Sequence, residues 1–136
     1  MVAYVVLKTN HTTESSLCEQ FSENELGIAG DVIGATPTFV GTHEMQHNGQ
    51  LLAMANAEKL EARKAIELNS HPYLNIFSTA NEEIYGDVYV FYLDDSFMMC
   101  NVNESLVRRL SFRQKWCHMR LHLVAQQTMT GDEASE

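Results

Sequence analysis

The apolar positions of the chain fall mostly into short runs that are typical of strands. Residues 2–8 are apolar nearly throughout, which predicts a strand inside a sheet. Residues 84–93 carry four aromatic side chains and predict a second strand, because aromatic residues favour a pleated surface. Residues 94–96 (Asp-Asp-Ser) then predict a turn, and residues 97–100 predict a partner strand that returns along the second one.

Two further segments predict shorter elements. Thr12 or Thr13 is a suitable N-cap for a short helix that ends near Phe21. Residues 28–33 (Ile-Ala-Gly-Asp-Val-Ile) place a Gly-Asp turn among β-branched residues and predict the entry to a strand. The same Gly-Asp pattern returns at residues 84–89, but its flanks differ, so we predict no internal repeat.

Two longer helices are predicted in the second half of the chain. Asn56 is a good N-cap for a helix through about Leu68, whose modest apolar stripe suits packing on a sheet. Asn103 caps the longest predicted helix, which runs to about Gln127. One face of this long helix has apolar residues at helical spacing, namely Leu106, Leu110, Cys117, Leu121 and Val124. Further apolar residues lie off this stripe, namely Val107, Phe112, Trp116, Met119 and Leu123.

These elements predict a single α+β domain over residues 1–130, followed by an acidic tail at residues 131–136. The domain consists of a mostly antiparallel sheet of five or six strands, with the middle helix and the long C-terminal helix packed on it. At 136 residues the chain is long enough to bury roughly two-thirds of the surface that it exposes when unfolded.

Residues 38–52 admit two interpretations that exclude each other. They contain His43-Glu44-x-x-His47, the zinc-metalloprotease signature, which needs a helix to bring both imidazoles to one face beside the glutamate base. They also predict a β-hairpin, because the Asn-Gly pair at residues 48–49 suits a type I′ turn and apolar runs flank it. β-Branched residues before the motif favour a strand, so we predict the hairpin. A zinc site with ligands His43 and His47 and with Glu44 as the base is the alternative.

No catalytic residue, metal site or cofactor is predicted elsewhere. The motif has no third zinc ligand at a recognisable spacing. His118 and His122 have the i, i+4 spacing of a metal pair, but without a further ligand nearby we favour solvated or partly buried histidines. The sequence has no Gly-rich phosphate loop, no Ser-His-Asp order and no Cys-x-x-Cys. We therefore expect a protein that is not an enzyme.

The net charge of −9 is distributed unevenly along the chain. Residues 1–103 carry fourteen acids and four bases, whereas residues 104–126 carry five bases and one acid. Phosphate is repelled by such an acidic body, which argues against non-specific binding of nucleic acid. The tail after Gly131 is acidic again.

The cysteines and the apolar runs indicate the cellular compartment in which the protein is expected. Cys18, Cys100 and Cys117 are an odd number without paired spacing, which favours a reducing, cytosolic compartment over a disulfide framework. No apolar run is long enough to span a bilayer, and the N-terminus lacks the pattern of a signal peptide. We expect no association with membranes.

Three segments follow one another in an order that points to a family. They are residues 28–33, residues 48–52 with Asn56 after them, and residues 84–88 (Ile-Tyr-Gly-Asp-Val). This order resembles a family of small domains of unknown function encoded by phages, plasmids and other mobile elements. In that family a Gly-Gly strand entry, an Asn-Glu-Glu-Gly-Lys-Leu hairpin and an Ile-x-Gly-Asp strand occur in turn. The resemblance implies an α+β fold and a viral or mobile-element setting, and the family has no catalytic residues to carry over.

That resemblance has limits. It covers roughly residues 25–95 and none of the C-terminal helix. It departs from the family at the hairpin, where His47 stands before the Asn-Gly pair, and its spacing is looser.

The long basic helix is the predicted interaction surface. Aromatic residues interleaved with arginine have the composition of interface hot spots, although the second apolar face could instead be buried against the sheet and the middle helix. The predicted partner-binding residues are Arg108, Arg109, Phe112, Arg113, Lys115, Trp116, Met119 and Arg120.

We expect a small phage or viral accessory protein that binds and modulates a host protein. The partner is a host protein or a second copy of the chain, as a possible homodimer, in the cytoplasm of the host cell. The alternatives are the zinc-dependent hydrolase and nucleic-acid binding through the basic helix.

Overall fold

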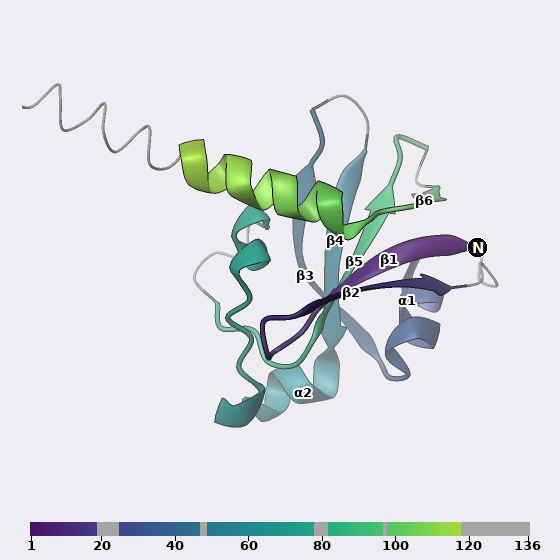
Figure 1. Cartoon of the computed structure of the whole chain (residues 1–136). Coiled ribbons are helices and arrows are strands. Elements are labelled where there is room, and N and C mark those ends of the chain that lie inside the picture. The colour runs from purple at the N-terminus through teal and green to yellow at the C-terminus, as the bar shows by residue number, and fades with distance from the viewer. Residues whose placement is uncertain (19–24, 47–48, 78–81, 97, 118–136) are drawn as a thin grey trace, which may run out of the picture.

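The computed structural model describes residues 1–18, 25–46, 49–77, 82–96 and 98–117. They form a six-stranded sheet in which all paired strands are antiparallel. The main path of the sheet is β2-β1-β5-β4-β3, and β6 pairs with β5 off this path (Figure 1). The strands are β1 (Val2–Leu7), β2 (Thr13–Cys18), β3 (Pro37–Glu44), β4 (Gln50–Asn56), β5 (Val88–Leu93) and β6 (Met99–Cys100). The predicted α+β class and antiparallel sheet are confirmed.

Helices are placed on both faces and at one end of the sheet. They are α1 (Glu25–Ile33), α2 (Ala57–Ala62), the 3-10 helices η1 (Ala65–Glu67) and η2 (Pro72–Ile76), and residues 104–117, called the C-terminal helix below. Within the described part of the chain, no helix combines the length and the apolar composition needed to cross a bilayer.

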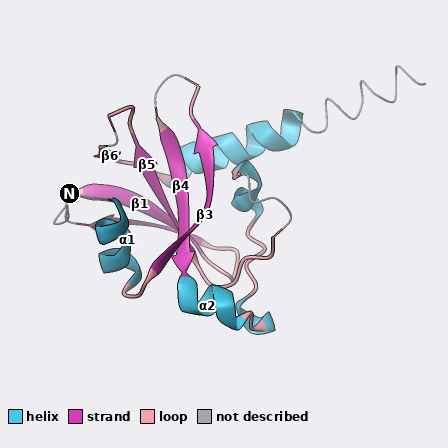
Figure 2. Ribbon diagram, turned by 180° about the vertical axis from the view of Figure 1, so that it is seen from behind, coloured by secondary structure: helices cyan, strands magenta, loops and turns pink. Residues whose placement is uncertain are grey.

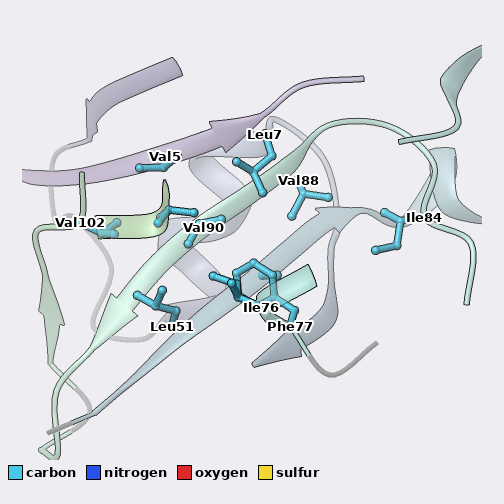
Figure 3. Close-up of a cluster of buried hydrophobic side chains, with 11 residues drawn as sticks. Val5, Leu7, Leu51, Ile76, Phe77, Ile84, Val88, Val90 and Val102 are labelled. Atoms are coloured by element: carbon cyan, nitrogen blue, oxygen red, sulfur yellow. The ribbon is translucent and has the colours of Figure 1, made fainter. Parts of the chain in front are cut away.

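The larger hydrophobic core lies on the face of the sheet that η2 and the C-terminal helix cover (Figures 1 and 3). Alternate residues of a strand point to the same face, so β1, β4 and β5 each contribute two alternate residues to this core. The buried members are Val5, Leu7, Leu51, Ala53, Ile76, Phe77, Ile84, Val88, Val90, Val102 and Val107. Each buried aliphatic or phenyl side chain contributes roughly 1.5–3 kcal/mol, so this core is what holds the C-terminal helix on the sheet.

A smaller core lies on the opposite face, under α1 (Figure 2). Leu52, Met54 and Phe91 project from β4 and β5 and meet Ala29 of α1. Tyr4 stacks on Phe91 with ring centroids 5.6 Å apart. The sheet is therefore the middle layer of three.

The C-terminal part of the sheet matches the prediction in outline. β6 pairs with the end of β5, and the Val102 N–H donates to the Ala3 carbonyl at 3.1 Å, so the segment also contacts the start of β1. The predicted turn after β5 is present, since the Asp94 carboxylate accepts from the N–H groups of Ser96 (2.8 Å) and Met98 (2.9 Å). Residues 84–87 precede β5 rather than belong to it. The predicted first strand is β1.

Residues 13–18 form the strand β2, so the helix predicted from Thr12 or Thr13 is wrong. β2 pairs with β1 along its whole length, and the turn between them has the Lys8 N–H donating to the Thr12 carbonyl at 3.0 Å. The strand lies at the sheet edge and its residues are largely exposed, so its sequence lacks apolar alternation. Its conformation is determined by pairing with β1, and the local sequence pattern of residues 13–18 does not reveal that pairing. Phe21, the predicted helix end, lies outside the described residues.

Residues 28–33 belong to the helix α1, so the predicted strand entry is wrong. Ala29, Val32 and Ile33 have the i, i+3, i+4 spacing of a helix and pack on the smaller core. The helix ends at Ile33, and the next residue, Gly34, has a φ of +73°, which suits the left-handed residue after a helix. Its N–H donates to the Gly30 carbonyl at 2.9 Å. Helical burial outweighs the β preference of valine and isoleucine here.

The middle helix starts where predicted and ends early. The Asn56 side chain accepts from the N–H groups of Glu58 (2.9 Å) and Lys59 (3.3 Å). The helix α2 then stops at Ala62, because Arg63 adopts a left-handed φ of 47°. No side chain of α2 is buried, so little packing supports a longer helix. Leu60 of α2 packs against the larger core, and η2 contributes the buried Ile76 to the same core.

The β3–β4 hairpin is confirmed, but its predicted turn is wrong. Pairing runs from Pro37↔Asn56 to Glu44↔Gln50, and the Met45 N–H donates to the Gly49 carbonyl at 3.0 Å. A two-residue type I′ turn at residues 48–49 would instead pair residue 47 with Gln50. Gly49 does have a positive φ, 77°, and a side chain there would collide with the Leu93 carbonyl.

Candidate protein-binding surface

The inner side of the C-terminal helix is fixed by the core and by η2. Asn103 caps the helix by accepting the Leu106 N–H at 2.9 Å, as predicted, and Val107 is fully buried. One turn later, the Ser111 hydroxyl donates to Asn75 Oδ1 at 2.8 Å, and Asn75 Nδ2 donates to the Ser111 carbonyl at 3.2 Å. Since Asn75 belongs to η2, this pair sets the orientation of the helix.

The outer side of the same helix exposes two aromatic residues one turn apart. Phe112 is 73% exposed and Trp116 is 57% exposed. Together with Arg108, Arg109 and Arg113 they line a shallow depression of about 790 Å³, called the aromatic–arginine face below. Aromatic side chains of this size are normally buried for most of their surface, so this face is unusual for a free protein surface.

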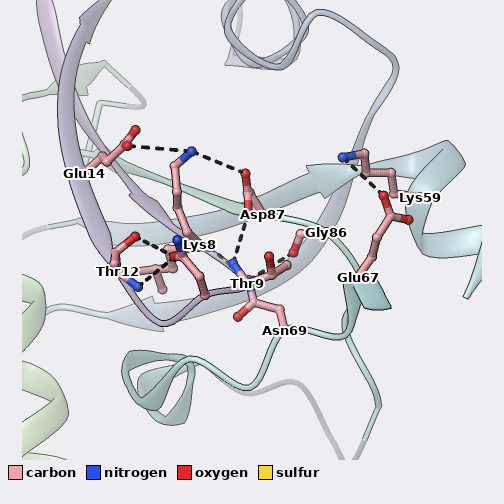
Figure 4. Close-up of polar contacts among 11 residues, drawn as sticks. Lys8, Thr9, Thr12, Glu14, Lys59, Glu67, Asn69, Gly86 and Asp87 are labelled. Atoms are coloured by element: carbon pink, nitrogen blue, oxygen red, sulfur yellow. Dashed lines mark hydrogen bonds and ion pairs between the residues drawn. The ribbon is translucent and has the colours of Figure 1, made fainter. Parts of the chain in front are cut away.

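The bases of the helix have no acidic partner in the described part of the chain. The helix carries Arg108, Arg109, Arg113 and Lys115 against Glu104. The ion pairs that the described residues form are Lys8–Glu14 (3.7 Å), Lys8–Asp87 (3.9 Å) and Lys59–Glu67 (3.5 Å), all in the body of the domain (Figure 4). Among the described residues, these four bases therefore have no ion-pair partner.

A groove separates the C-terminal helix from the tip of the β3–β4 hairpin. This space, called the hairpin groove below, has a volume of about 540 Å³. Met45, Tyr92, Leu106 and Leu110 are its apolar residues that also touch the larger core. Arg109 and Arg113 line one wall, and they line the aromatic–arginine face as well. The face and the groove therefore share a boundary, called the arginine ridge below.

The structure brings five of the predicted partner-binding residues together, namely Arg108, Arg109, Phe112, Arg113 and Trp116. Lys115 is also exposed on the helix. Met119, Arg120, Leu121, Val124 and the pair His118 and His122 lie outside the described residues, as do the predicted helix end and the acidic tail. The groove was missed by the sequence reasoning, because no local signal relates residues 43–46 to the helix.

The His-Glu-x-x-His motif does not adopt the geometry of a metalloprotease site. His43 and Glu44 are consecutive residues of the strand β3, so their side chains point to opposite faces. His43 Nδ1 lies 3.0 Å from the Ile76 carbonyl oxygen and can donate a hydrogen bond to it. His47 lies outside the described residues. Among the residues that are described, no three His, Cys, Asp or Glu side chains gather in a way that could hold a metal ion.

A polar cluster that the sequence reasoning missed lies at the other end of the sheet. Asn69 is buried and donates to the carbonyls of Leu7 (2.9 Å) and Gly86 (3.0 Å), as Figure 4 shows in part. Its Oδ1 accepts the His71 N–H at 3.0 Å. Asn69 thereby joins β1, the segment that leads into β5 and the start of η2. The sequence indicated only a helix stop at this point.

His71 is the buried titratable group of that cluster. The Tyr73 N–H donates to His71 Nδ1 at 3.1 Å, so the neutral ring carries its proton on Nε2, 2.9 Å from the Thr13 hydroxyl. Burial lowers the pKa of His71, and the nearby His11 imidazole lowers this pKa further. His11 Nε2 lies 2.7 Å from the Ser70 hydroxyl, which ties the β1–β2 turn to the same segment. We assign these contacts to the stability of the fold.

Comparison with protein-family models, with curated proteins and with solved structures finds no match for this chain.

Proposed function

We propose that this chain is a non-enzymatic binding protein that docks a partner protein on the aromatic–arginine face. The observation that carries the proposal is the joint exposure of Phe112 and Trp116 beside bases that form no ion pair with a described acid. Tryptophan and arginine are the residue types most enriched among interface hot spots. Covering the two aromatic side chains removes apolar surface from water, and the bases select a partner of complementary charge.

The setting implied by the family resemblance belongs to the same proposal. A phage or plasmid accessory protein that acts on a host protein in the host cytoplasm needs a binding face and no catalytic centre. Single-stranded nucleic acids are also bound by bases interleaved with aromatic residues. The net charge of −9 opposes a polyanion, so we favour a protein partner and use an oligonucleotide as the competing ligand.

The test compares two double variants in affinity capture from host extract. Arg113→Glu with Trp116→Ala changes the proposed face. Lys64→Glu with Ile66→Ala makes a matched change of charge and apolar surface elsewhere, since Lys64 is exposed and Ile66 is 89% exposed. We expect the first variant to lose the captured partner and the second to retain it. Both should keep the circular dichroism and thermal unfolding of the wild type.

Self-association is examined in the same preparation by sedimentation velocity. A dimer that the first variant loses and the second retains would identify a second copy as the partner. The proposal fails if the wild type sediments as a monomer and the first variant retains every captured protein. Wild-type binding to a dT oligonucleotide that the first variant loses would assign the face to nucleic acid instead.

A further inference from the structure

We infer that the hairpin groove is the second half of the docking surface, and that its occupant is an acidic peptide segment with one apolar anchor side chain. This inference rests on the proposed function and names the chemistry of the partner. It adds a contact region that the exposed aromatic residues do not reach.

The arginine ridge makes the two regions continuous. Arg109 and Arg113 lie one helical turn apart, and both line the aromatic–arginine face and the hairpin groove. Any partner segment that crosses the helix over Phe112 and Trp116 toward the hairpin must pass over these two guanidinium groups. Carboxylate side chains are suited to this position, because a guanidinium binds a carboxylate through two parallel hydrogen bonds.

Beyond the ridge, the groove has an apolar part that the domain itself does not fill. Leu106, Leu110 and Tyr92 touch the larger core but stay only partly buried. The volume of about 540 Å³ falls inside the roughly 300–1,000 Å³ range of ligand-binding pockets. An apolar side chain of the partner gains burial here, whereas a sugar–phosphate backbone gains nothing from these leucines.

The negative charge on the hairpin side of the groove sets the orientation in which the peptide binds. Glu44 is exposed at the end of β3 and is one of the residues that line the groove on its hairpin side. A second acidic residue of the partner would be repelled at Glu44. The fitting segment therefore carries its acids over the ridge, its anchor between the walls, and a neutral or basic residue beside the hairpin.

The protein contains two built-in reporters on the two sides of the ridge. Trp116 is the single tryptophan and reports on the aromatic–arginine face by its fluorescence. Cys117 is exposed and lines the groove, so its alkylation rate reports on the groove. Cys18 and Cys100 are less exposed and serve as internal references when each thiol is followed by peptide mapping of the wild-type protein.

The experiment uses three capped ten-residue peptides as probes. The first carries Asp and Glu with leucines, the second replaces the acids by Lys, and the third replaces the leucines by Ser. We expect only the first peptide to change the Trp116 emission saturably and to slow alkylation of Cys117, with Cys18 and Cys100 unchanged. Added salt should weaken this binding, because part of it is ionic.

Two charge variants test the groove separately from the face. Glu44→Gln should tighten binding of the acidic leucine peptide by about two- to fivefold, because it removes a negative charge beside the groove. Glu58→Gln makes the same charge change on α2, where Glu58 is exposed, and should leave the affinity unchanged. An equal response of both variants would mean that only the net charge matters, which would overturn the inference.

The remaining outcomes separate the inference from the proposed function. A Trp116 signal without protection of Cys117 overturns the groove as a contact region and leaves the binding face standing. Protection of Cys117 by dT oligonucleotide, or by raised protein concentration without peptide, overturns the acidic peptide as the occupant. Absence of both signals also overturns the inference. The proposed function then fails only if affinity capture is negative as well.

Discussion

The segment around Asn69 and the outer side of the C-terminal helix differ in whether their side chains have partners within the protein. Each polar group named at Asn69 and His71 has a partner at 2.9–3.1 Å. Within the described residues no buried side-chain nitrogen or oxygen lacks a hydrogen bond. On the helix, by contrast, Phe112 and Trp116 face water beside bases that form no ion pair with any described acid.

This difference separates stability from function. A polar group inside the fold costs free energy unless it is bonded, so a saturated network marks contacts that hold the domain together. Exposed aromatic and basic side chains add little to folding, because they keep their contact with water in both states. Substitutions in the hydrogen-bonded segment around Asn69 should therefore change the free energy of unfolding. Substitutions on the outer surface of the helix should change partner binding instead.

The largest loss of stability is expected for Asn69→Leu. Leucine has a similar size but leaves the Leu7 and Gly86 carbonyls and the His71 N–H without their partners. We expect the free energy of unfolding in urea to fall by about 3–5 kcal/mol. The control is Asn10→Ala, since Asn10 accepts two hydrogen bonds from Thr12 in an exposed turn and should cost less than about 1 kcal/mol. Similar losses for both would remove burial as the explanation.

The next largest effect is expected where the hairpin approaches β5, beside the groove. Gly49→Ala would place a Cβ 2.0 Å from the Leu93 carbonyl oxygen in addition to the strain of its positive φ. We expect a loss of about 2–4 kcal/mol in thermal or urea unfolding, and a larger one for Gly49→Val. Gly34→Ala is the matched control, because Gly34 has a φ of +73° but open space around it. Its loss should stay near 1–2 kcal/mol, which is the backbone strain alone.

The sequence predicted those elements whose signals are local. The apolar run of β1 and the aromatic run of β5 lie in or next to the strands that they predict, and Asn56 and Asn103 come directly before the helices that they cap. The prediction made a helix of the strand β2 and a strand entry of the helix α1. β2 is a strand because β1 lies beside it, which neighbouring residues do not reveal. In α1 the helical spacing of Ala29, Val32 and Ile33 is short and competes with the β preference of valine and isoleucine, and packing on the sheet decides for the helix.

The candidate site was predictable in part for the same reason. Excess apolar residues around the C-terminal helix indicated a second surface, and the structure places Phe112 and Trp116 in water. The hairpin groove needs residues 43–46 beside residues 106–117, which is a consequence of sheet topology. The saturated network at Asn69 depends likewise on three segments that are distant in sequence.

A smaller effect on stability is expected when the pH falls. The pKa of His71 is below its ordinary value of about 6.5, so the unfolded chain takes up a proton before the folded one does. The stability that the neutral ring contributes is complete above about pH 6.5 and is lost as the pH falls through the folded pKa, by at most about 1.4 kcal/mol per pH unit. Urea unfolding of the wild type between pH 7.5 and pH 5 measures this slope.

His71→Asn should flatten that slope, because asparagine can still accept the Tyr73 N–H and does not titrate. His11→Asn is the control. Asparagine tolerates the left-handed φ of 69° at this position, and burial of His71, the larger cause of its lowered pKa, is unchanged. If His11→Asn removed the pH dependence of stability and His71→Asn kept it, the pH dependence would belong to His11, which would contradict the prediction.

The smallest effect on stability is expected for Phe112→Ala with Trp116→Ala, although this change should abolish partner capture. Both side chains lie mostly in water, and alanine is the best helix former, so the free energy of unfolding should change by less than about 0.5 kcal/mol. Val107→Ala on the inner side of the same helix removes a fully buried side chain and should cost roughly 2 kcal/mol while the binding face stays intact. Urea unfolding and affinity capture of the two variants therefore give opposite patterns. A loss above about 1.5 kcal/mol for the aromatic double variant would mean that these rings support the fold, and their exposure would then no longer indicate a binding surface.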